Sequence, residues 1–317
     1  MTSAPHGLTP KMKPVSPRRS FDVCALDIGT SKIACVIARL RPCAAREVLR
    51  RRTHAVEVRG IGHTLARGIK SGTVVNLGEA ERAVRQAVDA AERMAGLHVE
   101  SVVLSVSAGR MASERFAATV PVHGSMASDR DIERVLAAGS QHSLRNGRVV
   151  LHSLPIGYSL DESRGIRDPR GMLGRRLGVD MHVVTVEAAA VRNLKLAVER
   201  CHLAVEAMVA APYMAGLAGL ADDEADLGAA VVDLGAGTTT IAVFAGGRFV
   251  HADGFALGGA NVTMDLARGL PAAIADAERI KTLHGHAIAG SSDDRDMIPV
   301  SAVGEDEREP PHLLSRA

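Results

Sequence analysis

The sequence predicts an α/β protein of two domains, and three observations carry this prediction. Its 317 residues are enough for two ordinary domains, each with a hydrophobic core of its own. Short β-rich runs alternate with segments of helical periodicity along most of the chain. A pattern of strand, Asp, Gly-rich turn and strand occurs once in each half, which indicates that the same element opens both domains.

Composition excludes several classes of partner. Lysine and arginine total 38 against 36 aspartate and glutamate, so the net charge of +2 creates no field that would attract nucleic acid. Five Phe, two Tyr and no Trp are too few for the stacking platforms of single-strand and sugar binders. We therefore expect no nucleic-acid partner, and binding must come from a defined site.

The four cysteines show neither CxxC spacing nor the density of a secreted scaffold; they are Cys24, Cys35, Cys43 and Cys201. This pattern favours buried thiols in a reducing cytosol over a structural zinc site. Residues 1–20 mix Pro with Lys and Arg without an apolar run, which predicts a disordered basic tail. Residues 203–221 are apolar, but Glu206 and Pro212 indicate a strand that leads into a helix.

The first domain is predicted to begin with an antiparallel meander over residues 21–27, 32–40 and 54–62. The next helix has clear signals at both ends. Asn76 is a suitable cap, Glu79 follows three residues later, and Gly96 is a stop.

Residues 99–177 then change character. We expect strands over 99–107, 116–122 and 148–160, with a short helix from Ser128. Strand residues alternate with period 2, and the block lies outside the repeated turns, so we interpret it as an inserted interaction module. The first domain resumes with a strand over 179–187, a helix, and a strand over 205–209, which together form an α/β crossover.

The second domain is predicted to start with a meander over residues 228–244 and 248–255, turned by Gly246 and Gly247. Helices should follow over 261–268 and 271–284, the second with Pro in its first turn. Beyond Gly290 there is no apolar period, which predicts solvated or loosely packed chain. The expected division is a tail at 1–20, a first domain at 21–98 and 179–226, an inserted subdomain at 99–178, and a second domain at 227–317.

The repeated turns have the composition of phosphate-binding loops. The first comprises Asp27, Gly29, Thr30, Ser31 and Lys32, and the second Asp233, Gly235, Gly237, Thr238 and Thr239. Glycine lets backbone N–H groups close on a phosphate, hydroxyls add donors, and the aspartates can hold Mg2+ through water. One such turn is weak evidence, because many hairpins use Gly and Thr for turn geometry alone. Two turns that face each other favour a nucleoside triphosphate.

Two features leave alternatives open. Glu278 and Lys281 share one face of a predicted helix, and they either take the ribose and base of a nucleotide or form a solvent-facing ion pair. Lys32 either contacts a phosphate or is simply solvated. Gly258 and Gly259 complete the candidate nucleotide-binding set.

These residues resemble the actin, Hsp70 and sugar-kinase superfamily, with residues 27–33 and 231–240 as its two phosphate motifs. Within it the chain is similar to the FtsA family of bacterial cell-division proteins, almost continuously from Phe21 to Ala317. The most specific stretches are residues 71–76, 151–161, 168–172, 277–281 and 284–285.

This resemblance implies an actin-like ATPase fold of two ribonuclease-H-like domains, with a small α+β subdomain inserted in the first and the second incomplete. It implies ATP and Mg2+ as ligands, weak or no ATPase activity, and self-association into filaments. It also implies an adaptor that ties FtsZ polymers to the inner face of the cytoplasmic membrane at the septum. The membrane contact would use a C-terminal helix absent from this chain, and residues 99–178 would contact other division proteins.

Three departures from the family pattern bear on this expectation. Thr240 stands where relatives often have Asp, and Ala210 and Ala211 stand where hydrolysing members of the superfamily place Glu or Gln. The chain stops at Ala317, before the family's later adenosine motif, so we expect it to bind nucleotide poorly and membranes not at all. The alternatives are a sugar or small-molecule kinase, for which Asp233 could serve as base, and a chaperone-like ATPase. The absence of an evident substrate pocket disfavours the kinase, and the absence of a peptide-binding domain disfavours the chaperone.

Overall fold

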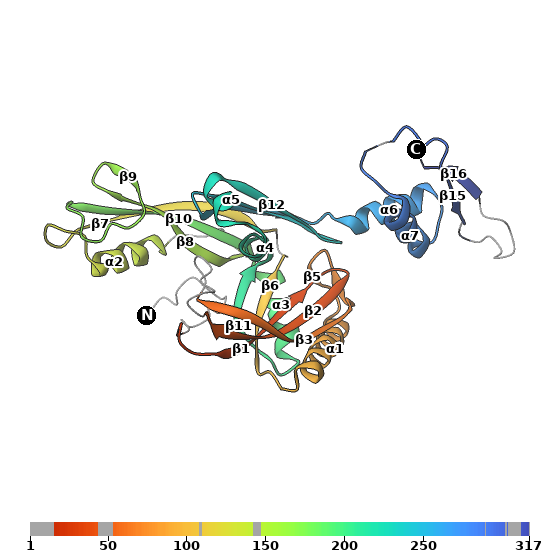
Figure 1. The fold of residues 1–317 in the computed structure, drawn as a ribbon, viewed down its shortest axis with the longest axis horizontal. Helices are drawn as coiled ribbons and strands as arrows, with labels where there is room; N and C mark the ends of the chain where they lie inside the picture. The colour runs from red at the N-terminus through yellow and green to blue at the C-terminus, as the bar shows by residue number, and fades with distance from the viewer. Residues whose placement is uncertain are drawn as a thin grey trace.

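A computed structural model describes residues 16–43, 53–107, 110–141, 147–288, 290–301, 303 and 312–316. Its largest unit is a five-stranded sheet in the order β11-β6-β1-β2-β3 (Figure 1). The strands are β1 (Phe21–Ile28), β2 (Lys32–Pro42), β3 (His54–Leu65), β6 (Ser101–Val106) and β11 (Ala204–Ala210). The predicted meander is confirmed, because β1, β2 and β3 pair antiparallel, whereas β6 and β11 add in parallel.

Helix α1 (Leu77–Ala95) lies directly on this sheet because both surfaces carry small residues. The Asn76 side chain accepts a hydrogen bond from the Glu79 amide at 3.2 Å, and Gly96 ends the helix at φ 67°, as predicted. A β carbon at Gly60 of β3 would lie 2.2 Å from the carbonyl oxygen of Ala91. Because α1 packs closely on β3 and also contacts β2, it supports the β1–β2 hairpin through the sheet. Helix α3 (Ala188–Glu199) packs beside α1.

The inserted unit is a four-stranded sheet in the order β7-β10-β8-β9, which α2 (Asp129–Gly139) covers. Its strands are β7 (Ala112–Pro121), β8 (Arg148–Leu160), β9 (Ser163–Ile166) and β10 (Arg176–Glu187). Helix α2 begins at the predicted cap, Ser128, whose hydroxyl donates to Asp131 at 2.6 Å.

The edges of the inserted unit differ from the boundaries expected at residues 99 and 178. Strand β6 pairs with β1 and β11 in the first sheet, whereas β10 pairs with β7 and β8 along its whole length. On β10, Val183 lies in the core of the inserted unit, and the next residue, Val184, lies in the main core. The long strands β8 and β10 therefore join the two cores.

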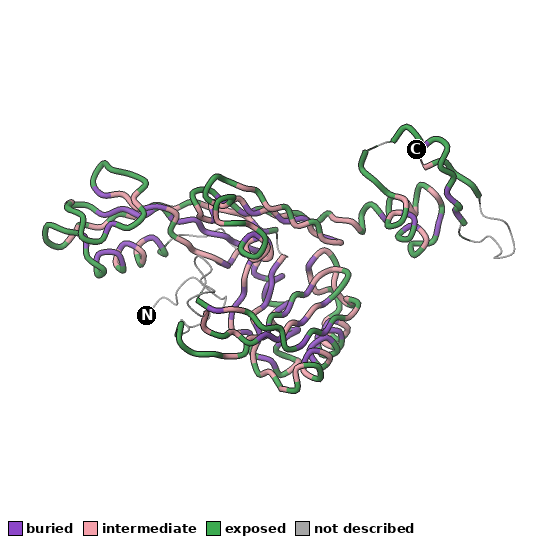
Figure 2. Tube along the Cα trace, in the orientation of Figure 1, coloured by how far each residue is buried: buried purple, intermediate pink, exposed green. Residues whose placement is uncertain are grey.

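A three-stranded antiparallel sheet follows, made of β12 (Ala229–Leu234), β13 (Thr239–Ala245) and β14 (Arg248–Phe255). Helices α4 (Ala211–Gly219) and α5 (Asp222–Leu227) pack on one face, and β14 contacts β7, β8 and β10. The opposite face is open, with Val232 52% and Leu234 76% exposed. Figure 2 shows the contrast between the buried strands of the main core and this part of the chain.

The last elements form a separate small unit at the right of Figure 1, composed of α6 (Gly259–Gly269), α7 (Ile274–His284), β15 (Met297–Val300) and β16 (His312–Ser315). The helix predicted from Pro271 begins at Ile274 instead. Beyond Gly290, where the sequence predicts solvated or loosely packed chain, β15 pairs antiparallel with β16; β16 is exposed, as predicted, but β15 buries two residues. Ile298 and Val300 bury one face of β15 beside Ile280, a four-residue pattern too short to stand out in the sequence.

Candidate nucleotide-binding site

The two Gly-rich turns are equivalent in structure as well as in sequence. In the first, the amide of Gly29 donates to the carbonyl oxygen of Lys32 at 3.0 Å, and in the second Gly235 donates to Thr238 at 2.9 Å. A β carbon would approach those same oxygens to 2.8 Å at Gly29 and 2.9 Å at Gly235. Each turn therefore requires glycine at its first position for the backbone to close.

The two turns meet at Thr30 and Gly237. A β carbon at Gly237 would lie 2.7 Å from both Oγ1 and Cγ2 of Thr30, and 3.0 Å from the Cα of Ser71. The Thr30 hydroxyl accepts a hydrogen bond from the amide of Gly72 at 3.0 Å. Ser71 and Gly72 turn the short hairpin of β4 (Ile69–Lys70) and β5 (Thr73–Val74), with φ of 47° and 69°. A third segment therefore joins the two predicted turns.

The two aspartates at the strand ends are close enough to interact. Burial and, next, the negative charge of Asp27 raise the pKa of Asp233 above its ordinary value. Thr240 is buried directly across from Asp233 in the β12–β13 register, so a third carboxylate is absent at the position where the sequence departs from the family pattern. A pair of repelling carboxylates on Gly-rich turns is a donor set that suits a hydrated Mg2+.

Gly258 and Gly259 rest on the second turn. The amides of Gly259 and Ala260 donate to the carbonyl oxygens of Gly235 and Ala236 at 3.0 and 2.7 Å. A β carbon at Gly258 would come within 2.3 Å of the Gly235 oxygen. The start of α6 is therefore fixed to the candidate site.

Glu278 and Lys281 share one face of α7, as predicted, and their ion pair measures 2.7 Å. Lys281 Nζ also donates to the carbonyl oxygen of Gly259 at 3.2 Å and to the Thr263 hydroxyl at 2.9 Å. The Thr263 hydroxyl donates a further hydrogen bond to Glu278. Lys281 and, next, Thr263 lower the pKa of Glu278. The pair is thus part of a network that links α7 to the start of α6, rather than an isolated surface pair.

The other predicted turn residues differ in exposure. Ser31 and Lys32 are exposed in the first turn, and Thr238 is half-buried in the second. Thr239 donates its hydroxyl to the carbonyl oxygen of Leu257 at 2.8 Å, so that group already has a structural role. Ser71, Gly72 and Thr263 were not among the predicted residues. Ser71 and Gly72 lie in a stretch quoted for its family resemblance, and this was the only signal.

Ala210 and Ala211 lie where β11 ends and α4 begins. The Ala210 amide donates to Nε2 of His152 at 2.9 Å. Neither residue carries a side chain that could orient water.

In the part of the chain that the structure describes, there is no cluster of three or more His, Cys, Asp or Glu side chains placed to hold a metal ion. In the same residues, every helix is too short or too polar to span a bilayer.

Two family models match the chain. The model described as "SHS2 domain inserted in FTSA" matches residues 108–185, and the model described as "Cell division protein FtsA" matches residues 230–315. The first match covers the inserted unit from β7 to near the end of β10.

Curated relatives match over nearly the whole chain. "Cell division protein FtsA" of Agrobacterium fabrum is 54% identical over 312 residues, which cover 98% of this chain and 70% of the relative. The protein of the same name from Escherichia coli K12 is 32% identical, covering 93% and 67%. A solved structure, "PilM-PilN type IV pilus biogenesis complex", has a TM-score of 0.57 at 17% identity and covers 83% of this chain and 69% of that one. Together with the inserted-domain match, this likeness confirms the predicted actin-like α/β fold.

Proposed function

Because this chain belongs to the FtsA family of bacterial cell-division proteins, we propose that it is an ATP-binding adaptor of the division machinery and not an enzyme. The observation that carries the nucleotide part is the direct contact between the two equivalent turns, at Thr30 and Gly237. A site with backbone amides and hydroxyls from both sides suits a chain of phosphates.

Mg2+ would be held through water by Asp27 and Asp233, and it would neutralise phosphate charge between the turns. Burial and, next, repulsion from Asp27 raise the pKa of Asp233, and a divalent cation would relieve that repulsion. The turn residues proposed to bind phosphate are Gly29, Thr30, Ser31, Lys32, Gly235, Gly237, Thr238 and Thr239. Gly258, Gly259, Glu278 and Lys281 are proposed to lie toward the nucleoside.

Weak or undetectable hydrolysis follows from the side chains at the end of β11. Alanine at residues 210 and 211 offers no group to position water, and Thr240 leaves one carboxylate fewer beside the metal. Bound nucleotide would then act as a conformational ligand that favours an assembly-competent state of the protein.

The partners proposed for this function follow from family membership. They are FtsZ polymers, further copies of this chain in an actin-like filament, and other division proteins through the inserted block expected at residues 99–178. The place of action would be the cytoplasmic side of the inner membrane at the septum. The chain spans about 70% of the Agrobacterium fabrum relative. We assign the membrane contact to a C-terminal helix of the family.

The experiment is calorimetric titration of MgATP into the wild type and the Asp233→Asn variant. Asparagine preserves the shape of the side chain but removes its charge, so we expect at least a tenfold loss of Mg-dependent affinity. The matched control is Asp253→Asn, an exposed aspartate on β14 of the same sheet. Unchanged affinity in Asp233→Asn would show that the metal site is misplaced. A phosphate-release rate on the order of 1 per second or more, which is typical of kinases, would overturn the non-enzymatic part.

A further inference from the structure

Two thiols lie in contact on the strands that the first turn joins. The sulfur atoms of Cys24 on β1 and Cys35 on β2 are 3.3 Å apart, and the residues are 3% and 0% exposed. In the strand register Cys35 pairs with Leu26, and Cys24 pairs with Ile37, so the cysteines are diagonal neighbours on the inner face of the sheet. Their segment encloses the turn that contains Gly29 and Thr30.

The contact makes the two thiols chemically unequal. The hydrogen bond between the two sulfurs, in which either thiol can be the donor, raises the pKa of Cys24 and lowers the pKa of Cys35. Burial and the negative charge of Glu92 act against ionisation at both sulfurs. Cys35 is therefore the sulfur that is more readily ionised, and a thiolate is the form that reacts with oxidants.

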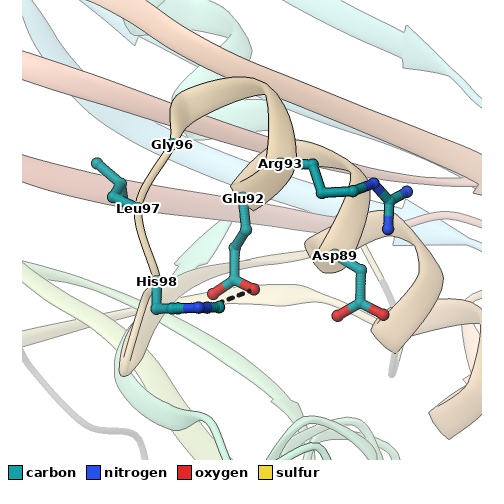
Figure 3. A pocket seen from close by; sticks show the side chains of 6 residues that line it. All are labelled: Asp89, Glu92, Arg93, Gly96, Leu97 and His98. Carbon is teal, nitrogen blue, oxygen red and sulfur yellow. Dashed lines mark hydrogen bonds and ion pairs between the residues drawn. The ribbon is translucent and has the colours of Figure 1, made fainter.

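A pocket of about 420 Å³ opens at the end of α1 (Figure 3). Glu92 lines it, together with Asp89, Gly96 and His98. The Glu92 carboxylate is held by the Val99 amide at 2.7 Å and by Nδ1 of His98 at 3.2 Å. The negative charge of Glu92 at this pocket acts on both thiols. Both thiols are themselves buried, so peroxide reaches them when the surrounding structure opens locally.

We propose that Cys24 and Cys35 are a redox-modification site that hydrogen peroxide converts to an intramolecular disulfide. The Cys35 thiolate attacks one peroxide oxygen, the O–O bond breaks, and the departing hydroxide takes a proton to become water, which leaves a sulfenic acid. Cys24 sulfur then attacks the sulfenic sulfur, the S–O bond breaks, and the leaving hydroxide takes the Cys24 proton. Two thiols lose two electrons and two protons, and one peroxide becomes two water molecules.

The diagonal placement makes this disulfide reversible. Cα atoms of diagonal neighbours in antiparallel strands lie about 7–8 Å apart, at or beyond the usual limit for a disulfide. Bond formation must therefore distort the paired strands β1 and β2, and strained disulfides are the ones that are easily reduced. The oxidised hairpin would hold the first turn in an altered geometry. The bond itself does not depend on the proposed nucleotide function.

The test is peptide mapping of the folded wild-type chain after exposure to peroxide. Trypsin cuts after Lys32, which separates the Cys24 peptide, residues 20–32, from the Cys35 peptide, residues 33–39. After acid quenching and blocking of free thiols with N-ethylmaleimide, we expect these two peptides to be linked at least tenfold more often than any pair with Cys43 or Cys201. Free thiols should fall from four to two per chain and return to four with dithiothreitol.

A Cys43→Ser, Cys201→Ser double variant is the matched control, since it should form the same link at the same rate. The proposal is overturned if Cys24 and Cys35 carry the maleimide after peroxide while Cys43 or Cys201 is oxidised. It is also overturned if the 20–32 to 33–39 link forms only after the chain is unfolded in urea.

Discussion

Thr30 and Gly237 lie in direct contact, although 206 residues (31–236) lie between them in the sequence. There is room for hydrogen at Gly237 but not for a methyl group, which would come 2.7 Å from two atoms of Thr30. Thr30 cannot easily move aside, since its hydroxyl is held by the Gly72 amide. This contact makes one site of two separate hairpins.

Gly237→Ala should therefore destabilise the protein. Overpacking at a buried contact costs about 1–3 kcal/mol, so we expect a lower midpoint of thermal unfolding. The control is Gly269→Ala at the end of α6, where a β carbon meets no atom within 4 Å. Equal midpoints for the two variants would show that the turns are not in contact in solution.

Asp233→Asn should have opposite effects on stability and on binding. Without Mg2+ it removes a half-buried charge that Asp27 repels, so we expect the unfolding midpoint to rise by about 1–3 °C. With MgATP the same variant should gain less stability from the ligand than the wild type. A fall of the ligand-free midpoint, with no change in Asp253→Asn, would contradict the repulsion between the two aspartates.

Because His182 is buried as a neutral ring, we expect the free energy of unfolding to fall as the pH is lowered. The ring is buried between β10 and β14, with Nδ1 donating to the carbonyl oxygen of Phe249 and Nε2 beside the Ser113 hydroxyl, each at 2.8 Å. Burial lowers its pKa to about 4 from an ordinary 6.5. The unfolded chain then binds a proton first, so stability is full above pH 6.5 and is lost as the pH falls toward 4.

Thermal melting from pH 7.5 to 4.5 tests this expectation. The exposed His98→Gln variant should retain the decline, and His182→Gln should flatten it below pH 6.5. A wild-type profile that overlies His182→Gln throughout would show that His182 is not buried as a neutral ring.

Local signals explain why parts of the fold could be predicted. Asn76, Gly96 and Ser128 act on their own helix ends, and the Gly-rich turns act within one hairpin, so a few adjacent residues are enough to indicate each. Strand partners are decided at long range. Nothing near residues 101–106 indicates that β6 joins β1, and nothing near residues 176–187 indicates that β10 stays in the inserted sheet.

The candidate site likewise combines local signals with long-range contacts. Its two turns can be predicted because they repeat a composition. The turn of Ser71 and Gly72 has no phosphate-binding composition of its own and joins the site through contacts with Thr30 and Gly237. The Glu278–Lys281 pair was predicted from its spacing, but Thr263 and Gly259 become its partners only when α6 folds against α7.

Lys281→Met should loosen the unit formed by α6 and α7. The variant loses hydrogen bonds to Gly259 and Thr263 as well as the ion pair, a loss on the order of 1 kcal/mol for a partly exposed amine. We expect limited proteolysis within residues 259–284 to speed up several-fold. The control is Lys195→Met, which breaks a surface ion pair with Glu199 at 3.3 Å. Equal cleavage rates would mean that Lys281 does not hold the two helices together.

The central claim is that both turns contribute to a single nucleotide site, and calorimetric titration of MgATP tests it most directly. The proteins to compare are the wild type, Gly29→Ala and Gly235→Ala, because each variant places a β carbon within 3 Å of its own turn's carbonyl oxygen. The account predicts one MgATP per chain in the wild type and at least a tenfold weaker affinity in each variant, with folding verified by circular dichroism. Two binding events per chain, or full affinity in either folded variant, would contradict it.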